Sequence, residues 1–395
     1  MISGAGPDVC MVVYTNYAVD ARVRREAETL AAHGFRVQCL TNLNGGRARR
    51  FELDGVTVQE LPIPKYRGKS RGAYIASYTR FLGAAAAECV RQQRRGTLDV
   101  VHAHNMPDFL VFAGLLPRWR GARVVLDVHD TMPETFSSKF SHDAVRWRLL
   151  CLEERLSARV AHRVICVNHP QRDVLVARGL PEAKTFVSMN VPDPRVFRTS
   201  EAARPMLDGG PLNLVYHGTM AVRLGVDLLI HAVHALVGRV PGLKLHLWGG
   251  GDDLELFRSL VDRLGLSGHV SFRPQGYALE ALPVHLSAMD VGLVGNRRSI
   301  AGGLMLPVKM LEYVSLGIPV VVPRLRTIAH YFADDMVAYY EPDNAASLAE
   351  AIYRLHVEPE LRRALPARAR SFLHEHGWER QGPALVAFYR QLLET

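Results

Sequence analysis

One stretch of the chain combines glycine, proline, lysine and glutamate at a spacing that suits anion binding. Residues 302–321 read GGLMLPVKMLEYVSLGIPVV. Gly302 and Gly303 follow a β-branched run, and Pro307 stands where a helix is expected to begin, because proline lacks an N–H group that would be unpaired there. A helix entered through a glycine-bearing loop offers free backbone N–H groups and the positive end of its dipole. The stretch therefore predicts a diphosphate site.

Lys309 and Glu312 fall on the first turns of the same expected helix, three residues apart. A lysine in this place can pair with phosphate, and the carboxylate can accept hydrogen bonds from two ribose hydroxyls. The alternative is a surface ion pair between the two side chains, worth about 0.2–0.5 kcal/mol. The spacing alone leaves both interpretations open.

A second candidate lies near the middle of the chain, where residues 215–230 read VYHGTMAVRLGVDLLI. A strand predicted over Leu212–Tyr216 runs into Gly218 and Thr219, and glycine permits close approach of the backbone to a ligand. Arg223, at the entry to the next helix, can hold phosphate oxygens in a forked contact. The alternative is an ordinary surface arginine in a turn.

In the N-terminal half the candidate residues also follow predicted strands. His129 comes directly after Val124–Val128, where it can hydrogen-bond a ligand hydroxyl; the alternative is a partly buried histidine oriented by Asp130. Polar residues in neighbouring turns are candidates for contact with a second substrate: Asn16, Asp20, His104, Asn105 and Asp108.

Several other sites are excluded by pattern. No aspartate stands two residues from another, so a D-x-D metal site is not expected, and the chain lacks a Walker loop and a G-x-S-x-G elbow. We therefore expect no metal, with anion binding left to N–H groups, Arg223 and Lys309. A glycine turn at residues 249–253, GGGDD, is a weak signal, and its two aspartates are expected to cap a helix.

Length and composition indicate what must position these residues. A chain of 395 residues suits two domains, and a hydrophobic fraction of 48% with 22% charged residues is typical of globular proteins. No run of about 18 apolar residues predicts a transmembrane helix, and the N-terminal stretch does not resemble a signal peptide. The five scattered cysteines lack a CxxC pair, which argues against disulfides and zinc. We expect a cytoplasmic protein.

The net charge of +9 favours an anionic partner, which can be nucleic acid, an acidic membrane or a phosphorylated ligand; the alternative is a solvated surface rich in arginine. Cations concentrate in the Arg47–Arg71 region, just before Tyr74, Tyr78 and Phe81. No nucleic-acid-binding motif is present, so no nucleic acid is expected. The region supports the hypothesis of peripheral membrane contact.

Short β-branched runs alternate with segments of helical period, which predicts parallel α/β units. The expected strands of the first series are Val9–Tyr14, Arg36–Leu40, Val56–Leu61, Val100–Ala103, Val124–Val128, Val164–Val167 and Thr185–Met189, with helices that include Asp20–His33, Ala73–Arg91 and Ala144–Val160. The second series comprises Leu212–Tyr216, Lys244–Trp248, Val270–Arg273, Val291–Val294, Pro319–Val322 and Val337–Tyr340, with later helices Ala345–Leu355, Pro359–Phe372 and Trp378–Leu393.

Between the two series the periodicity lapses in a segment rich in proline, glycine and charge. We therefore expect an N-terminal domain over residues 1–195, a linker over 196–211, a C-terminal domain over 212–376 and a last helix over 377–395. Each domain is a Rossmann-like, doubly wound sheet, and ligands of such sheets bind beyond the carboxyl ends of the strands. The predicted architecture is two such domains facing across a cleft.

Taken together, these stretches resemble the retaining GT-B glycosyltransferases of family four over most of the chain. DARVRREAETLAAHGFRV is similar to the first helix of that group, and HGTMAVRLGVDLLI, GGGDDLELF and LPVKMLEYVSLGIPVVV follow in its order and spacing. The last segment is the most specific. The resemblance implies a hexosyltransferase type of enzyme with a nucleotide diphosphate sugar as co-substrate and no other cofactor.

The resemblance also implies roles for individual residues. Arg223 and Lys309 would bind the donor diphosphate and Glu312 the ribose, whereas His129 would contact the donor sugar near the reaction centre. Backbone around Arg273–Gln275 would meet the base. The helix from Trp378 would cross back onto the first domain.

Two positions depart from the family pattern. Leu304 stands where many members have a glutamate, so a backbone N–H at Gly302 or Gly303 is expected to substitute for it. Thr219 stands in place of the usual arginine, and Arg223 is the nearest replacement. Both changes suit a subgroup with the pattern L-P-x-K-x-x-E-Y.

The predicted function is a retaining, metal-independent transfer of a sugar to an unidentified acceptor, which is a small molecule, a glycan or a lipid-linked compound. No carboxylate pair for double displacement is evident, so front-face attack is favoured. The alternatives are an epimerase or phosphorylase on the same fold, and a nucleotide-sugar-binding protein that has lost catalysis. The second alternative is suggested by Leu304, which replaces a glutamate of the family.

Overall fold

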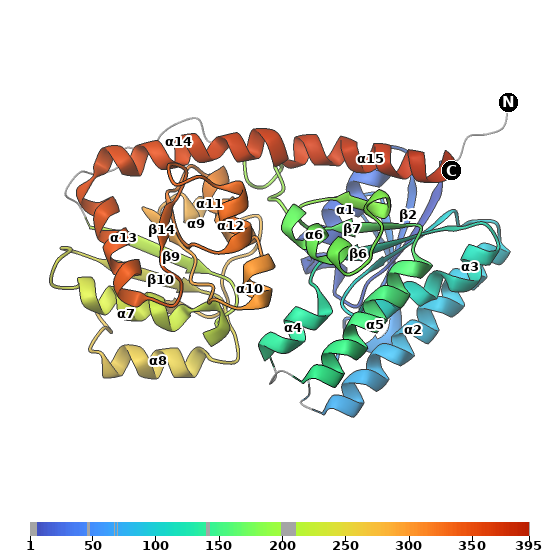
Figure 1. The fold of residues 1–395 in the computed structure, drawn as a ribbon, viewed down its shortest axis with the longest axis horizontal. Coiled ribbons are helices and arrows are strands. Elements are labelled where there is room, and N and C mark those ends of the chain that lie inside the picture. The colour runs from blue at the N-terminus through green and yellow to red at the C-terminus, as the bar shows by residue number, and fades with distance from the viewer. Residues whose placement is uncertain are drawn as a thin grey trace. The chain divides into compact units, whose positions relative to one another are not determined.

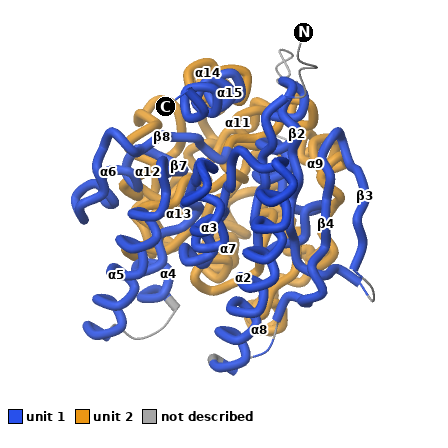
Figure 2. The backbone as a smooth tube through the Cα atoms, turned by 90° about the vertical axis from the view of Figure 1, so that its right-hand side faces the viewer, with its two compact units in different colours: residues 1–190, 381–395 blue, residues 191–380 orange. Residues whose placement is uncertain are grey.

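The structure is a computed structural model that describes residues 6–45, 48–66, 68, 70–139, 143–198 and 211–394. It divides into two compact units. Unit 1 comprises Met1–Asn190 and Gln381–Thr395, and unit 2 comprises Val191–Arg380 (Figure 2). Most of the predicted linker, residues 196–211, lies outside the described residues.

Unit 1 is built on an eight-stranded sheet with the order β3-β4-β2-β1-β5-β6-β7-β8 (Figure 1). All neighbouring strands are parallel except β3 and β4, which are antiparallel. The strands are β1 Asp8–Val12, β2 Arg36–Leu43, β3 Arg50–Leu53, β4 Val56–Pro64, β5 Val100–His104, β6 Arg123–Val128, β7 Arg163–Cys166 and β8 Thr185–Val187. Seven of these follow the predicted strands, and only the edge strand β3, which has no fully buried residue, was missed.

The helices of unit 1 connect these parallel strands. They are η1 Tyr17–Val19, α1 Ala21–Ala32, α2 Arg71–Arg94, η2 Asp108–Gly114, α3 Leu115–Trp119, α4 Met132–Lys139, α5 Ala144–Val160, α6 His169–Ala177 and η3 Glu182–Lys184. The returning helix α15, Trp378–Glu394, contributes its residues from Gln381 onward to this unit. The bounds of α5 are those predicted.

The alternation of β6 sorts its side chains between two faces of the sheet. Leu126 and Val128 join the apolar core that Phe81 of α2 also enters. Asp127, between them, points to the other face, where it meets Arg22 of α1. A carboxylate is thus placed on the buried side of a central strand.

Unit 2 carries a six-stranded sheet with the order β11-β10-β9-β12-β13-β14, in which all pairs are parallel. The strands are β9 Asn213–His217, β10 Lys244–Trp248, β11 Val270–Arg273, β12 Val291–Leu293, β13 Val320–Pro323 and β14 Ala338–Tyr340. The helices are η4 Val222–Leu224, α7 Val226–Leu236, α8 Leu254–Arg263, α9 Leu282–Leu286, α10 Ile300–Leu304, α11 Val308–Ser315, α12 Arg326–Tyr331, α13 Ala345–Val357 and α14 Pro359–His376.

Both units are α/β folds on parallel sheets, apart from the antiparallel edge strand β3, which confirms the predicted fold class. The apolar strands of unit 2 pack on α7 and α13 through residues such as Leu214, Leu229 and Ile352. Within the described ranges, no helix is both long enough and apolar enough to span a membrane.

Candidate active site

Lys309, on the first turn of α11, is a partly buried cation with an unusual environment. Its ammonium nitrogen lies 3.6 Å from the ring centroid of Tyr216. A Cβ atom added at Gly218 would come within 3.2 Å of that nitrogen, so the turn after β9 reaches the lysine. Burial lowers the pKa of Lys309 to about 7, Glu312 opposes this and Arg223 adds to it.

The expected alternative for this lysine was a surface ion pair with Glu312. In the part of the chain that the structure describes, no carboxylate forms an ion pair with Lys309; its recorded partner is the Tyr216 ring. A cation–π contact compensates a desolvated ammonium only in part. Lys309 is therefore suited to receive an anion.

The turn after β9 brings Gly218, Thr219 and Arg223 toward the same region. Gly218 has φ of +114°, a backbone conformation that glycine adopts without strain. Arg223 is exposed in η4. Burial lowers the pKa of Lys309 and raises that of Tyr216, and the charge of Arg223 adds to the first effect and opposes the second. A Cβ atom at Gly249 would lie 2.2 Å from Gly218 O, so the turn after β10 must also be glycine to pack here.

The loop before α11 differs from the expectation. Gly302 donates its N–H to Ser299 Oγ over 2.8 Å, and Gly303 donates to Ser299 O over 2.9 Å, because both lie inside the short helix α10. Their N–H groups are not free, which corrects the expectation that they replace the missing glutamate. The Leu304 side chain is buried, with 7% of its surface exposed.

Unpaired N–H groups occur instead at the start of α11. Pro307 is the N-cap residue, one position before the predicted place, and Met310 is the first residue whose N–H reaches back to Pro307 O, over 3.0 Å. The N–H groups of Val308 and Lys309 precede it and have no intrahelical partner. N–H groups in this position can bind an anion.

Glu312 is held by a residue that sequence reasoning did not assign. His217, the last residue of β9, lies with Nε2 2.5 Å from Glu312 Oε2, and Nε2 is the donor because a carboxylate only accepts. Its Nδ1 lies 2.9 Å from the Tyr313 hydroxyl. Within the described residues, no hydrogen bond to Oε1 of Glu312 is found. The position of His217 at a strand end, directly before Gly218, was the signal for this role.

Arg273 ends β11, where its Nε donates to Gly276 O over 2.8 Å and its guanidinium lies 4.1 Å from the centroid of the Tyr277 ring. His285 stacks on the same ring with 3.6 Å between centroids. These contacts fix the Arg273 side chain against the loop that follows β11. The expectation that backbone around Arg273–Gln275 meets the base stays a prediction.

In unit 1, His129 follows β6 and is fixed by a carboxylate. Its Nε2 lies 2.9 Å from Asp127 Oδ2, and its backbone N–H donates to Asn105 Oδ1 over 2.7 Å. The orienting residue is thus Asp127 and not Asp130, because strand alternation turns Asp127 toward the ring. About a quarter of the side chain, 23%, is exposed.

Arg22 completes the charge balance around Asp127. It donates to both carboxylate oxygens over 2.9 and 2.8 Å, and to Ser188 O over 2.9 Å. Burial by itself raises the pKa of Asp127, but Arg22 and His129 outweigh burial and hold it well below its usual range. Burial likewise lowers the pKa of His129, and the Asp127 charge reverses this and raises it. The pair therefore favours the protonated imidazole.

The polar cluster around Asp127 extends to the C-terminal helix α15. His104 Nδ1 lies 3.1 Å from Asp127 Oδ2, and His104 stacks on His102 with 4.0 Å between centroids. His102 Nδ1 in turn lies 2.6 Å from the Tyr389 hydroxyl of α15. A buried chain of polar contacts thus links α15 to His129.

Glu26, His102, His104 and Asp127 offer metal-ligand atoms within 4.8 Å of one another. Arg22 already binds Asp127 and lies 3.0 Å from Glu26, and its positive charge opposes a second cation in this place. The set fits an ion-pair network better than a metal centre.

The remaining candidates of unit 1 have local partners. Asn16 caps η1 and Asp20 caps α1 through side-chain oxygens, over 3.1 and 3.2 Å. Asn105 donates to Asp108 Oδ1 over 2.7 Å, and burial raises the pKa of Asp108 to about 6. These contacts shape the turns at the strand ends.

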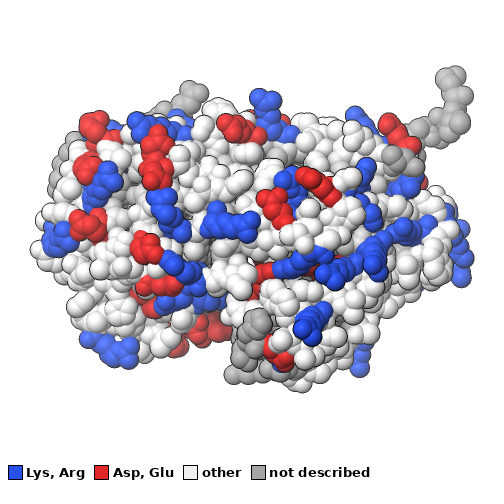
Figure 3. Space-filling view, in the orientation of Figure 1, with Lys and Arg blue, Asp and Glu red and all other residues white. Residues whose placement is uncertain are grey.

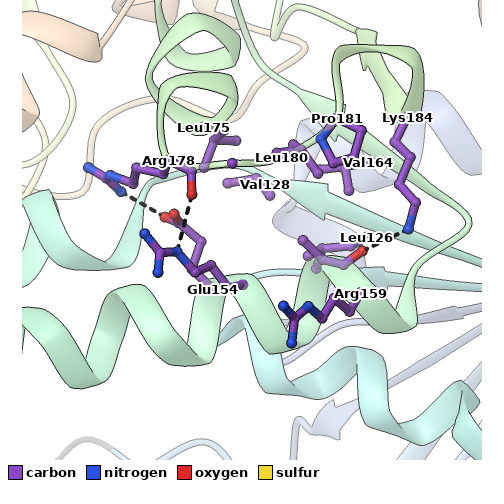
Figure 4. Close-up of a pocket in the computed structure, with 13 residues that line it drawn as sticks. Leu126, Val128, Glu154, Arg159, Val164, Leu175, Arg178, Leu180, Pro181 and Lys184 are labelled. Atoms are coloured by element: carbon purple, nitrogen blue, oxygen red, sulfur yellow. Dashed lines mark hydrogen bonds and ion pairs between the residues drawn. The ribbon is translucent and has the colours of Figure 1, made fainter.

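A cavity of about 360 Å³ lies elsewhere in unit 1, between α5 and the turn after α6 (Figure 4). Its lining includes the core residues Leu126 and Val164. Arg178 at its edge is held by Glu154 over 2.9 Å, and Lys184 donates to Ala161 O over 2.9 Å. None of the predicted site residues lines this cavity.

The chain folds into two doubly wound units. A partly buried lysine lies at a helix start in unit 2, and a histidine held by a carboxylate lies at a strand end in unit 1. This is the architecture of the GT-B glycosyltransferases. Solved structures share this fold. Sucrose-phosphate synthase from Thermosynechococcus elongatus matches with a TM-score of 0.80 at 19% identity, covering 98% of this chain and 100% of that one. HepE from Anabaena, in complex with UDP-glucose, matches with a TM-score of 0.70 at 13% identity, covering 97% and 99%.

Family models place the chain more narrowly. The Glycosyl transferase 4-like domain matches residues 18–190 and Glycosyl transferases group 1 matches residues 211–357. The protein belongs to the retaining family-four GT-B glycosyltransferases, which depend on nucleotide sugars, as the motifs predicted.

Relatives of the same family cover most of the chain. D-inositol 3-phosphate glycosyltransferase of Saccharomonospora viridis is 26% identical over 94% of this chain and 88% of its own length. Phosphatidyl-myo-inositol mannosyltransferase of Mycolicibacterium smegmatis is 27% identical over 83% and 78%. 2-Deoxystreptamine glucosyltransferase of Streptomyces kanamyceticus is 24% identical over 72% and 76%.

Proposed function

We propose that this protein transfers a sugar from a nucleotide diphosphate sugar to an acceptor hydroxyl, with retention of configuration and without a bound metal ion. The observation that carries the proposal is the environment of Lys309. A partly desolvated ammonium with a pKa near 7, seated at a helix start and without a carboxylate partner in the described chain, is arranged for a diphosphate.

In this reaction the bond between the anomeric carbon and the diphosphate oxygen breaks, and a bond to the acceptor oxygen forms. The acceptor proton passes to the departing phosphate, since the described ranges offer no evident carboxylate pair of the double-displacement kind. Lys309, Arg223 and the N–H groups at the start of α11 stabilise the charge that develops on the phosphate. Each such donor typically contributes about 3–4 kcal/mol.

The contacts within each unit support the other assignments. His217 holds Oε2 of Glu312, which leaves Oε1 for the ribose hydroxyls. Gly218 and Thr219 line the donor site, and the backbone beside Arg273 meets the base. His129 contacts the donor sugar through the ring nitrogen that Asp127 does not hold. Asn16, Asp20, Asn105 and Asp108 shape the acceptor side.

The donor is tested by thermal-shift measurements with a panel of nucleotide sugars. UDP-glucose and GDP-mannose head the panel, because HepE was solved with the first and GDP-mannose-dependent mannosyltransferases are among the relatives. A ligand at 100 times its dissociation constant adds about 2.7 kcal/mol to stability. The donor that binds is then incubated with candidate acceptors. Failure of every nucleotide sugar to bind would contradict the proposal.

Acceptor dependence separates the rival functions. An epimerase converts the donor fully without acceptor, and a phosphorylase requires inorganic phosphate, whereas a transferase shows only slow hydrolysis. A protein that binds the donor but never consumes it, with any acceptor, is a binding protein; the buried Leu304 in place of a glutamate is the feature that favours this outcome.

All five cysteines are free thiols, which supports a cytoplasmic location. The basic Arg47–Arg71 region supports peripheral contact with a membrane that holds a lipid-linked acceptor. Of that region, Arg47, Arg67 and Lys69 lie outside the described residues, and Arg49 pairs with Glu60 over 3.3 Å. Equal binding to neutral and anionic vesicles would show that the basic residues of this region do not drive membrane binding.

A further inference from the structure

Helix α5 of unit 1 exposes an apolar stripe that is not part of the candidate site. Val145, Leu149, Leu152 and Leu156 have exposed fractions of 67, 60, 50 and 42%. They recur at intervals of four, three and four residues, so they lie on one side of the helix. Contiguous exposed aliphatic side chains are uncommon on a monomer surface and mark interaction sites.

A row of arginines borders the stripe. Arg148 and Arg155 stand four and three residues from Leu152, and Arg159 stands three residues from Leu156, so each flanks an exposed leucine. All three arginines are exposed. Within the described residues none of them forms an ion pair; Arg155 donates only to Arg178 O, over 3.1 Å.

Neither of the two acidic residues of α5 belongs to the exposed class. Glu154 is buried and held by Arg178, and Glu153, which stands four residues from Leu149 and three from Leu156, is partly buried and accepts a hydrogen bond from Ser157. The outer face of α5 is therefore apolar and cationic, with no exposed carboxylate of its own. Figure 3 shows basic side chains in a band across the part of this view that unit 1 occupies.

We propose that the outer face of α5 docks on an anionic lipid bilayer, with the leucines in the boundary between headgroups and acyl chains and the arginines on lipid phosphates. A helix with aliphatic residues on one side and arginines beside them lies in the plane of such an interface. A second copy of this chain fits less well, because a contact between two such faces would bring together the arginines of both copies and no exposed carboxylate of α5 to pair with them. The inference uses residues other than the Arg47–Arg71 region and does not depend on the transfer reaction.

The test is co-sedimentation of the full chain with vesicles of phosphatidylcholine, with and without phosphatidylglycerol. Binding is expected only with the anionic lipid, and Leu149→Glu with Leu152→Glu should weaken it at least tenfold. Replacing Arg148, Arg155 and Arg159 together by glutamine should weaken it about 100-fold at low salt, since each surface cation contributes roughly a factor of five. Leu256→Glu is the matched control, because Leu256 is 50% exposed on α8 of unit 2; it should bind as the wild type does.

Three results would overturn the proposal. One is absence of binding to anionic vesicles, which would leave an acidic protein as the partner of this face. Another is equal binding by the leucine variant and the wild type, which would place the contact elsewhere. The third is a concentration-dependent dimer, detected by light scattering, that the leucine variant abolishes. Because nucleotide-sugar binding is measured separately by thermal shift, a failure here leaves the proposed transfer function untouched.

Discussion

The cluster around Asp127 in unit 1 and the surroundings of Lys309 in unit 2 treat a buried charge in opposite ways. Asp127 receives Arg22, His104 and His129, so its charge is balanced within the protein. Lys309 has an aromatic face and no recorded carboxylate partner in the described chain. The first arrangement fixes the orientation of the His129 side chain before any ligand binds. The second leaves a positive charge on Lys309 that an anionic ligand can balance. Four predictions test this contrast.

The largest effect is expected from Asp127→Asn. The change leaves the buried Arg22 without its main counter-ion, and breaking a buried pair typically costs about 3–5 kcal/mol. Hydrogen exchange of the β5 and β6 amides should report this loss in unit 1. The control is Asp54→Asn. Asp54 pairs with Arg24, which lies on α1 like Arg22, but its side chain is 51% exposed, and exposed pairs contribute about 0–1 kcal/mol. Equal losses in the two variants would contradict the contrast.

Lys309→Met should act on turnover and hardly on stability. The variant keeps the volume and removes the cation, so transfer is expected to slow by about 10²–10³-fold, the usual effect of deleting one donor to a developing negative charge. Because the native lysine is desolvated, its removal should leave the melting temperature unchanged or raise it. The matched control is Lys244→Met, an exposed lysine of β10. Undiminished turnover in Lys309→Met would remove Lys309 from the site.

The pH dependence of donor affinity sharpens the assignment of Lys309. The pKa of the free protein's lysine is lowered to about 7, and a diphosphate favours the protonated form, so binding takes up a proton above that pH. Affinity for the nucleotide sugar should therefore fall as the pH rises from 7.5 to 9, by up to about tenfold per unit. Calorimetry at several pH values measures this. The slope should vanish in Lys309→Met, and its survival there would implicate another group.

The smallest effect is expected from Tyr389→Phe, which deletes the hydroxyl that meets His102 at 2.6 Å. Loss of one buried hydrogen bond costs about 0.5–1.5 kcal/mol. Thermal unfolding of the full chain, followed by hydrogen exchange, should show the loss in unit 1 alone. A change confined to the strands of unit 2 would contradict the assignment of α15 to unit 1.

Much of the fold was predictable because strand and helix periods differ clearly along the chain. The bounds of β10, β11 and α5 were those expected, since each is a run of consistent period between turn residues. Strand β3 was missed because an exposed edge strand needs few apolar residues. Asp253 stands directly before α8, as expected of a capping residue. Its carboxylate, however, accepts from Val222 N–H over 2.9 Å and does not cap the helix.

The candidate site was predictable at the level of segments and less so at the level of atoms. The motif around Lys309 and the family resemblance pointed to the stretch that holds this partly buried lysine, whereas the hydrogen bond that occupies the Gly302 N–H depends on the neighbouring Ser299. His217 and Asp127 were not singled out because their partners, Glu312 and His129, are recognised only when strands are placed beside a helix or when side-chain faces are known. Contacts between residues distant in sequence carry no local pattern.

The return of α15 gives unit 1 a discontinuous chain, with unit 2 inserted between its two pieces. During synthesis the ribosome therefore produces the whole of unit 2 before it adds the C-terminal residues of unit 1. Until Tyr389 leaves the exit tunnel, His102 lacks its hydroxyl partner and the α1 side of the sheet lacks part of its cover. In nascent chains and C-terminal truncations, unit 1 should therefore be open to proteases and chaperones, although most of its residues are translated first.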